Sequence, residues 1–171
     1  TSSTIYKTPE NYVLHIGSFE RRKDLINLVK AFKLVGHPNL KLVLAGAQII
    51  NGNSKVLDQI KTFIVENKLK SKVILAGYVS NEEASVLYKN ARIYVFPSLD
   101  EGFGIPILEA LSFSLPVICS DIDVFKEVGG DCVEYFKVGD SVSLSKKIIS
   151  VLDSDKLRQN DNTEHINKFS R

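Results

Sequence analysis

Short apolar runs alternate along the chain with longer segments in which apolar residues recur every three or four positions. The short runs predict β-strands at residues 12–16, 40–45, 72–76, 91–96, 117–119 and 132–136. The periodic segments predict helices at residues 25–35, 55–68, 81–90, 106–115, 124–128 and 140–152. This alternation is typical of a parallel sheet covered by helices on both faces. The sequence therefore predicts an α/β fold, a Rossmann-like three-layer α/β/α domain with a parallel sheet of about six strands.

Two polar residues are predicted to cap helices. Ser80 precedes a helix and Glu83 follows three residues later, which is the pattern of a capping box. Asp123 is predicted to cap the short helix that runs towards residue 128. Asp121 and Asp123 also form a D-x-D pair, but a pair of carboxylates needs further ligands before it indicates Mg²⁺. The sequence therefore predicts no metal site.

Three loops follow predicted strands at their carboxyl ends. They are the basic loop after residue 16, the turn that begins at Gly77 and the polar loop after Phe96. In open parallel sheets, ligands bind outside the carboxyl ends of the strands. The three loops are therefore expected to converge on one edge of the sheet and to form a single site.

The segment from Phe96 to Pro116 carries the most specific chemistry. Pro106 suits the first turn of a helix, and the helix start preceded by residues 102–105 is a natural anion site, because its free amides point outward. Glu101 stands before these amides, and Glu109 lies inside the helix, about two turns from its start. Two carboxylates around an anion cradle suit a ligand with phosphate in the middle and hydroxyls at both ends, such as a nucleotide sugar. The alternative is that Glu101 caps the helix and Glu109 is solvated.

The loop after the first strand contains three consecutive cations, Arg21, Arg22 and Lys23. Cations at a helix start oppose the helix macrodipole, which is a local cost. Local violations of this kind tend to mark functional sites. The alternative is that the three side chains are solvated surface cations.

Composition limits the classes of function. The chain has 171 residues, of which 44% are hydrophobic, and this is enough for one well-buried domain. Its net charge is +2, and acidic and basic residues are interleaved, so the charge does not indicate nucleic-acid binding. Its apolar runs are shorter than the ~20 residues of a membrane-spanning helix, and we expect no signal peptide. Cys119 and Cys132 lie in apolar runs without metal-ligand spacing, so we interpret them as buried, reduced thiols of a cytoplasmic protein.

The run FPSLDEGFGIPILEALSFSLPVICSDI resembles the signature of the retaining GT-B glycosyltransferases of family 4, also called glycosyl transferases group 1. The signature has two glutamates separated by seven residues and opens with EGFG, which Glu101 to Glu109 match. The likeness extends from YVLHIGSFERRKDLINLVKAF through KLVLAG and VILAGYVSNEEASVLYKNARIYVFPS to HINKFSR. It implies the C-terminal, donor-binding half of a GT-B fold, with residues 12–171 as that domain and residues 1–11 as the linker from a missing N-terminal acceptor domain.

The resemblance also implies roles for the first loop. Lys23 matches a lysine that holds the donor's diphosphate, and Arg22 matches an arginine found before it in many members. Ser18, directly after Gly17, stands where the family usually has arginine. This departure leaves open how the diphosphate charge is compensated, with Arg21 or Arg22 as the substitutes.

The remaining site residues follow from the same resemblance. Glu101 is expected to bind sugar hydroxyls beside the developing positive charge, and Glu109 to bind the ribose hydroxyls. Backbone groups of Val79 are expected to read the base, while Tyr78 either stacks on the base or is an ordinary packed aromatic residue. Gly17 and Ser18 in the first loop are also expected to line the donor site. Backbone amides at the helix start are expected to bind the diphosphate, and these residues are Gly102, Phe103, Gly104 and Ile105.

The implied reaction transfers a sugar from a nucleoside diphosphate sugar to a hydroxyl acceptor with retention of anomeric configuration. The resemblance favours a mannosyl donor such as GDP-mannose and a role in polysaccharide synthesis. It implies a reaction without a cofactor or a metal ion. It also implies that catalysis requires the acceptor domain. It also suggests a full-length enzyme peripheral to the inner face of the membrane. The alternatives are a non-catalytic nucleotide-binding regulatory module, or a sugar-nucleotide epimerase or phosphorylase of the same architecture.

Overall fold

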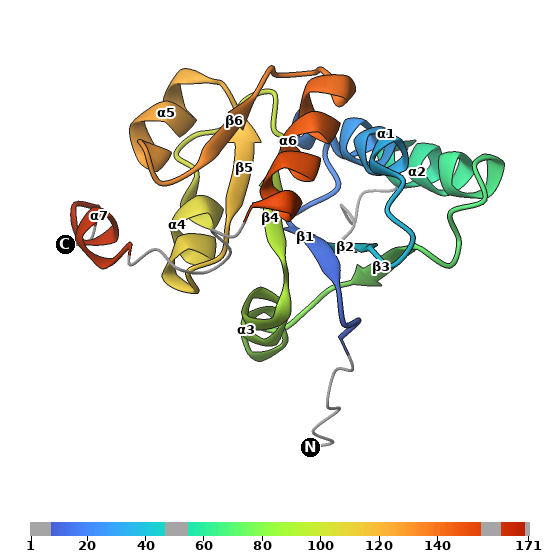
Figure 1. The fold of residues 1–171 in the computed structure, drawn as a ribbon, viewed down its shortest axis with the longest axis horizontal. Helices are drawn as coiled ribbons and strands as arrows, with labels where there is room; N and C mark the ends of the chain where they lie inside the picture. The colour runs from blue at the N-terminus through green and yellow to red at the C-terminus, as the bar shows by residue number, and fades with distance from the viewer. Residues whose placement is uncertain (1–7, 47–54, 155–161, 170–171) are drawn as a thin grey trace.

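A computed structural model describes residues 8–46, 55–154 and 162–169. Its centre is a six-stranded parallel sheet in the order β3-β2-β1-β4-β5-β6 (Figure 1). The strands are β1 (Tyr12–Ile16), β2 (Lys41–Ala45), β3 (Val73–Gly77), β4 (Ile93–Phe96), β5 (Val117–Ser120) and β6 (Glu134–Phe136). The predicted number of strands and their parallel direction are confirmed.

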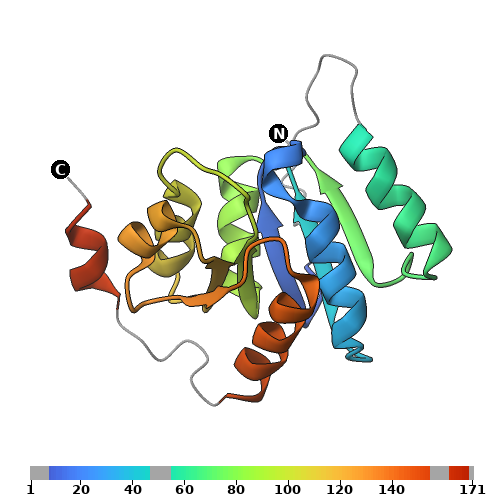
Figure 2. The ribbon, with the colours of Figure 1, turned by 90° about the horizontal axis from the view of Figure 1, so that it is seen from above.

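Helices cover both faces of the sheet. Apolar side chains of α1 (Leu25–Val35), α2 (Lys55–Glu66) and α6 (Ser141–Asp153) belong to one core cluster. A second cluster joins the other face of the sheet to α3 (Asn81–Asn90), α4 (Ile105–Ser112) and α5 (Asp123–Gly129). The short helix α7 (Thr163–Asn167) contacts α4, and it lies at the end of the molecule beyond α4 and α5 (Figures 1 and 2). The predicted three-layer α/β/α architecture is therefore confirmed.

The strand β1 shows why the sheet needs helices on both sides. Tyr12, Val13 and Leu14 are all fully buried, with Val13 in one core cluster and its two neighbours in the other. Because successive side chains of a strand point to opposite faces, a run that is buried throughout requires two covering layers. His15 continues this buried run as a polar residue.

Most predicted boundaries differ from the structure by no more than two residues, and the largest difference is at the end of α4, which stops at Ser112 and not at residue 115. Ser80 caps α3 as predicted, since its Oγ accepts a hydrogen bond from the Glu83 amide at 3.1 Å. The prediction for Asp123 is wrong: Ile122 is the N-cap of α5, and Asp123 is the first helical residue, where its charge still complements the helix dipole.

Two predicted segments lie outside the described ranges. They are residues 47–54, predicted as a loop, and residues 1–7 of the predicted linker.

The three consecutive cations do not form the start of α1. Arg21, Arg22 and Lys23 form a separate single turn of 3-10 helix, η1 (Arg21–Lys23), which ends at Asp24 in the left-handed conformation with φ 53°. The amide of Asp24 donates to the Arg21 carbonyl, and α1 begins at the next residue. The left-handed residue separates the basic turn from the helix, so the expected conflict with the macrodipole of α1 is relieved.

Within the described ranges, no helix is long and apolar enough to cross a bilayer, and no group of three metal-binding side chains occurs. Cys119 and Cys132 are free thiols. Cys119 is buried as predicted, and burial raises the pKa of its thiol, whereas Cys132 is only half-buried.

Candidate functional site

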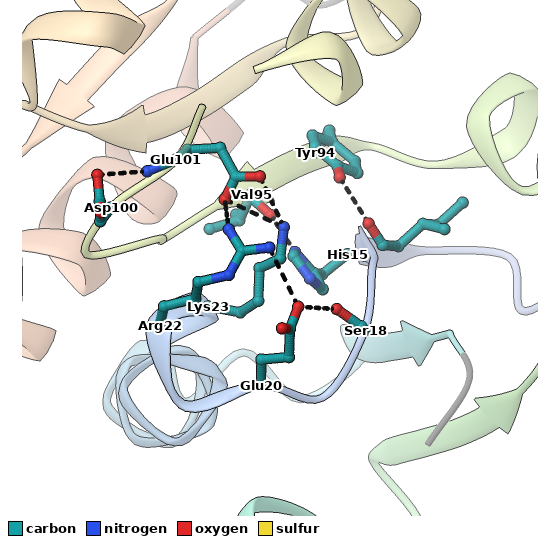
Figure 3. A network of polar contacts seen from close by, with 10 residues as sticks. His15, Ser18, Glu20, Arg22, Lys23, Tyr94, Val95, Asp100 and Glu101 are labelled. Atoms are coloured by element: carbon teal, nitrogen blue, oxygen red, sulfur yellow. Dashed lines mark hydrogen bonds and ion pairs between the residues drawn. The ribbon is translucent and has the colours of Figure 1, made fainter. Parts of the chain in front are cut away.

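The loop that follows β1 and the loop that follows β4 are joined by ion pairs at Glu101 (Figure 3). Its Oε1 lies 2.9 Å from Nζ of Lys23, and its Oε2 lies 2.8 Å from Nη1 of Arg22. The amide of Leu99 also donates to the Arg22 carbonyl at 2.7 Å, which holds the two loops together through the backbone. The first and third of the loops predicted to converge are therefore in direct contact.

Lys23 is buried, although it is a lysine on a surface turn. Its side chain is 8% exposed, and its ammonium lies over the Phe96 ring at 5.1 Å from the centroid. A buried ammonium requires a carboxylate or an aromatic face nearby, and Lys23 has both. The alternative that Lys23 is a solvated cation is wrong. Arg22 has a half-exposed side chain that is nevertheless bound to Glu101, while Arg21 is exposed.

Ser18 occupies the position where the resembled family has arginine, and it orients a second carboxylate. Its hydroxyl donates to Oε2 of Glu20, the atom that also lies 3.2 Å from Nη2 of Arg22. Donation by Ser18 is the largest cause that lowers the pKa of Glu20, and the charge of Arg22 adds to it against the opposing effect of burial. Arg22 thus contacts two carboxylates, Glu20 and Glu101.

The start of α4 has exposed residues on both sides of its N-cap, Gly104, which is itself buried. Gly104 is in the left-handed conformation with φ 97°, Pro106 is at the second helical position, and the N-cap contributes no side-chain hydrogen bond. Gly102 and Phe103 are exposed, as is Ile105. A helix start of this kind presents free amides and positive potential to an anion. The carboxylate of Glu101 binds Lys23 and Arg22, so the alternative that its role is to cap α4 is wrong.

Glu109 lies four residues after Ile105, where α4 begins, so it is about one turn from the helix start and not two. Its Oε2 accepts a hydrogen bond from the Tyr88 hydroxyl at 3.2 Å, although Glu109 is exposed. Glu109 is therefore solvated, as the alternative expected, but one hydrogen bond also orients its carboxylate. Burial, more than the neighbouring charge of Glu109, raises the pKa of Tyr88, so this hydroxyl remains protonated and can donate.

The carboxyl ends of β1, β2 and β3 are hydrogen-bonded in a row by their glycines. The amide of Gly17 donates to the Ala45 carbonyl, and the amide of Gly46 donates to the Gly77 carbonyl. Gly46 has φ 141°, and a Cβ there would lie 1.8 Å from the Gly17 carbonyl oxygen. Glycine is therefore required at position 46, where the chain leaves β2 beside the end of β1.

The turn after β3 presents an aromatic side chain to solvent. Gly77 is left-handed with φ 69°, Tyr78 is 78% exposed and Val79 packs partly against the second core cluster. The alternative that Tyr78 is an ordinary packed aromatic residue is wrong. The turn lies two strands away from β1, at the same edge of the sheet.

Sequence reasoning missed His15, which lies beneath the site. It is fully buried, its Nδ1 lies 2.9 Å from the Val95 carbonyl, and its ring stacks at 6.0 Å from those of Tyr94 and Phe96. Because a carbonyl only accepts, Nδ1 carries the proton, and burial lowers the pKa of His15 to about 4. The imidazole is therefore neutral. The available signal was a polar residue inside an otherwise apolar strand.

Comparison with known proteins identifies the family. The family model described as glycosyl transferases group 1 matches residues 3–165, nearly the whole chain. The chain belongs to the glycosyl transferases group 1 family. The family predicted from the EGFG segment is thereby confirmed.

Two curated relatives are mannosyltransferases by name. The chain is 34% identical to O-antigen chain mannosyltransferase B of Escherichia coli over 151 residues, which is 88% of this chain and 39% of that protein. It is also 34% identical to O-antigen chain mannosyltransferase RfbU of Salmonella typhimurium over 145 residues, with 85% and 39% covered. The chain thus spans about two-fifths of the length of these relatives.

A solved structure shows the same fold. Anabaena Alr3699/HepE in complex with UDP and glucose superposes with a TM-score of 0.83 at 20% sequence identity. The match covers 94% of this chain and 45% of that chain. The GT-B Rossmann-like fold class predicted from the sequence is confirmed.

Proposed function

We propose that this chain is the donor-binding domain of a retaining glycosyltransferase that transfers a sugar from a nucleoside diphosphate sugar to a hydroxyl acceptor. The observation that carries the proposal is the Glu101 carboxylate, held between Lys23 and Arg22 in front of the start of α4. This arrangement places cations, free amides and a carboxylate at one point of the sheet edge. A diphosphate and a sugar hydroxyl need these groups side by side.

The diphosphate would lie between the basic turn and α4. Lys23 and Arg22 supply positive charge, and the backbone at Gly17, Ser18 and Gly102–Ile105 lines the approach to it. As the bond to the sugar breaks, negative charge develops on the departing diphosphate. Donors and cations already fixed in position stabilise that charge without reorganisation. In this role the domain needs no metal ion.

The two glutamates would bind the hydroxyls at either end of the donor. Glu109, oriented by Tyr88, accepts from the ribose hydroxyls, and Glu101 accepts from the sugar. Carboxylates only accept hydrogen bonds, so they complement hydroxyl groups and not phosphate oxygens. Glu101 also lies where it stabilises a positively charged, oxocarbenium-like sugar. This position accounts for its partial burial, at 12% side-chain exposure.

The base would lie at the turn after β3. Two strand spacings separate β3 from β1, roughly 10 Å, which matches the extent of a nucleoside. Backbone groups of Val79 would contact the edge of the base, and the exposed ring of Tyr78 offers a stacking surface.

The sugar and the setting are inferred from the relatives. Both named relatives are O-antigen mannosyltransferases, which favours a mannosyl donor such as GDP-mannose and a role in polysaccharide synthesis. Each relative is more than twice as long as the matched region, so we propose that an N-terminal acceptor domain completes the active site. The complete enzyme would act at the cytoplasmic face of the membrane as a peripheral protein.

A binding panel tests the proposal. The chain is titrated calorimetrically with GDP, UDP, dTDP and ADP and with the corresponding sugar nucleotides. We expect one base to bind, and Glu109→Ala to weaken that binding about tenfold or more, through loss of hydrogen bonds to a charged acceptor. Glu134→Ala removes an equal charge from an exposed ion pair elsewhere and should bind like wild type. Equal losses in the two variants, or no binding of any nucleotide, would contradict the proposal.

A second experiment separates a transferase from a non-catalytic module. Adding the N-terminal half to the chain should produce sugar transfer to an acceptor, and the anomeric configuration of the product reports retention directly. Binding without transfer or donor hydrolysis in the longer protein would favour the regulatory module. Conversion of the free sugar nucleotide into its epimer would favour an epimerase.

A further inference from the structure

Arg22 is shared by two carboxylates, and the proposed donor site uses only one of them. Its Nη1 lies 2.8 Å from Oε2 of Glu101, and its Nη2 lies 3.2 Å from Oε2 of Glu20. Glu101 has a task in the proposed site, because it faces the sugar. Glu20 precedes η1 on the same loop as Arg22 and has no task assigned so far.

Glu20 is held in this position from two sides. The Ser18 hydroxyl donates to the same oxygen that Arg22 contacts (Figure 3). Both contacts favour the ionised carboxylate. The resembled family usually has arginine at the position of Ser18. Here the Ser18 hydroxyl instead directs the negative charge of Glu20 towards Arg22.

The charges of this network balance before any ligand arrives. Arg22 and Lys23 contribute two positive charges, and Glu20 and Glu101 contribute two negative charges. A diphosphate adds further negative charge to a cluster that is already neutral. It therefore competes with the two carboxylates for the charge of Arg22, whose N–H donors Nη1 and Nη2 already face Glu101 and Glu20.

We propose that Glu20 is a positioning residue that holds Arg22 in place and competes with the diphosphate for it. The inference rests on the proposed function, since it concerns the anion site of that function. On binding, the diphosphate replaces Glu20 at Nη2 of Arg22. The carboxylate remains close by, so the donor and the departing nucleoside diphosphate are both bound less tightly than the two cations alone would bind them.

The test uses inorganic pyrophosphate, because it presents the diphosphate without a base or sugar. The chain is titrated and the dissociation constant is read from the amide NMR signal of Gly104 at the start of α4. Glu20→Gln removes the charge and keeps the shape, and Glu20→Asp keeps the charge. Glu134→Gln removes the same charge from its exposed pair with Lys147, on β6 and α6.

We expect Glu20→Gln to bind pyrophosphate about two- to fivefold more tightly at low ionic strength, the range of an exposed ion pair. The gain should vanish at about 1 M salt, where the Debye length is about 3 Å. Glu20→Asp and Glu134→Gln should bind like wild type. Unchanged or weaker binding in Glu20→Gln, a gain that salt does not reduce, or an equal gain in Glu134→Gln would overturn the inference. Absence of any response of Gly104 in wild type and Glu20→Gln would overturn the proposed anion site as well.

Discussion

The ammonium of Lys23 lies 2.9 Å from Oε1 of Glu101, although the two residues are 78 positions apart in the chain. The pair joins the loop of β1 to the loop of β4, which are neighbouring strands at the centre of the sheet. It also places the residue expected to hold the diphosphate against the residue expected to hold the sugar. The contact therefore has a structural and a chemical consequence, and both can be measured.

Replacing Lys23 by methionine should lower the free energy of unfolding by about 1–3 kcal/mol, because Glu101 then loses its buried partner. Urea denaturation measures the loss. Lys147→Met removes one partner of an exposed pair and should cost less than about 1 kcal/mol. If the two variants are equally stable, the Lys23–Glu101 pair does not stabilise the fold.

His15 should make the chain less stable in acid. Its pKa is about 4 in the folded state against 6.5 when exposed, so between these values the unfolded chain binds more protons. The stability that neutral His15 contributes should therefore be complete above about pH 6.5, and up to about 3 kcal/mol of it should be lost as the pH drops towards 4. His15→Phe should abolish this slope, while His37→Phe, at an exposed histidine, should keep it. A slope that survives in His15→Phe would contradict the assignment.

Asp24 should make the chain more stable in acid, which is the opposite of the effect of His15. Burial raises the pKa of this half-buried carboxyl to about 6 from 3.8, so the folded chain binds more protons between these values. The carboxylate therefore costs stability above about pH 6. Asn tolerates the left-handed conformation with φ 53° and carries no charge, so Asp24→Asn should be more stable at pH 7 by up to about 1 kcal/mol, once solvent screening is allowed for. Thermal melts at pH 4 and 7 measure this, and an equal gain at both values would contradict the electrostatic cause.

Gly46→Ala should destabilise the fold severely. The added Cβ would lie 1.8 Å from the Gly17 carbonyl oxygen, which is backbone and cannot move aside without breaking the row of strand ends. We expect a loss above about 3 kcal/mol, or failure to fold. Gly139→Ala is the matched control: its φ is 77°, but nothing lies within 4 Å of the new atom, so it should cost only about 1 kcal/mol. Similar losses in both variants would show that the contact with Gly17 is not the cause.

Much of the fold was predictable because its signals are local and repeated. The buried runs at β1 and β2, followed by periodic helices, can only be satisfied by a parallel sheet with two covering layers. The convergence of the loops after β1 and β4 followed from that topology, since parallel strands end at one edge. Glu101 and Lys23 could therefore be assigned to one site before their contact was known.

The remaining details depend on contacts that no local pattern reports. Asp24 adopts a left-handed conformation that ends η1, which a run of three cations before a helix does not indicate. Ser18 reads in sequence as a missing charge, but its hydroxyl directs Glu20 towards Arg22. His15 is neutral because the two covering layers bury it, and its Nδ1 donates to the Val95 carbonyl on the adjacent strand. Each of these depends on a neighbour that only the folded chain provides.

The most direct test of the account is an NMR map of nucleotide binding to this chain. GDP and UDP are titrated separately, and the backbone amide signals of all assigned residues are followed. The account predicts that shifts for one of the two gather at three places, the turn at Gly17 and Ser18, the turn at Tyr78 and Val79, and the start of α4 at Gly104 and Ile105. Shifts confined to another region, such as β6 and α6, or no shift with either nucleotide at millimolar concentration, would contradict it.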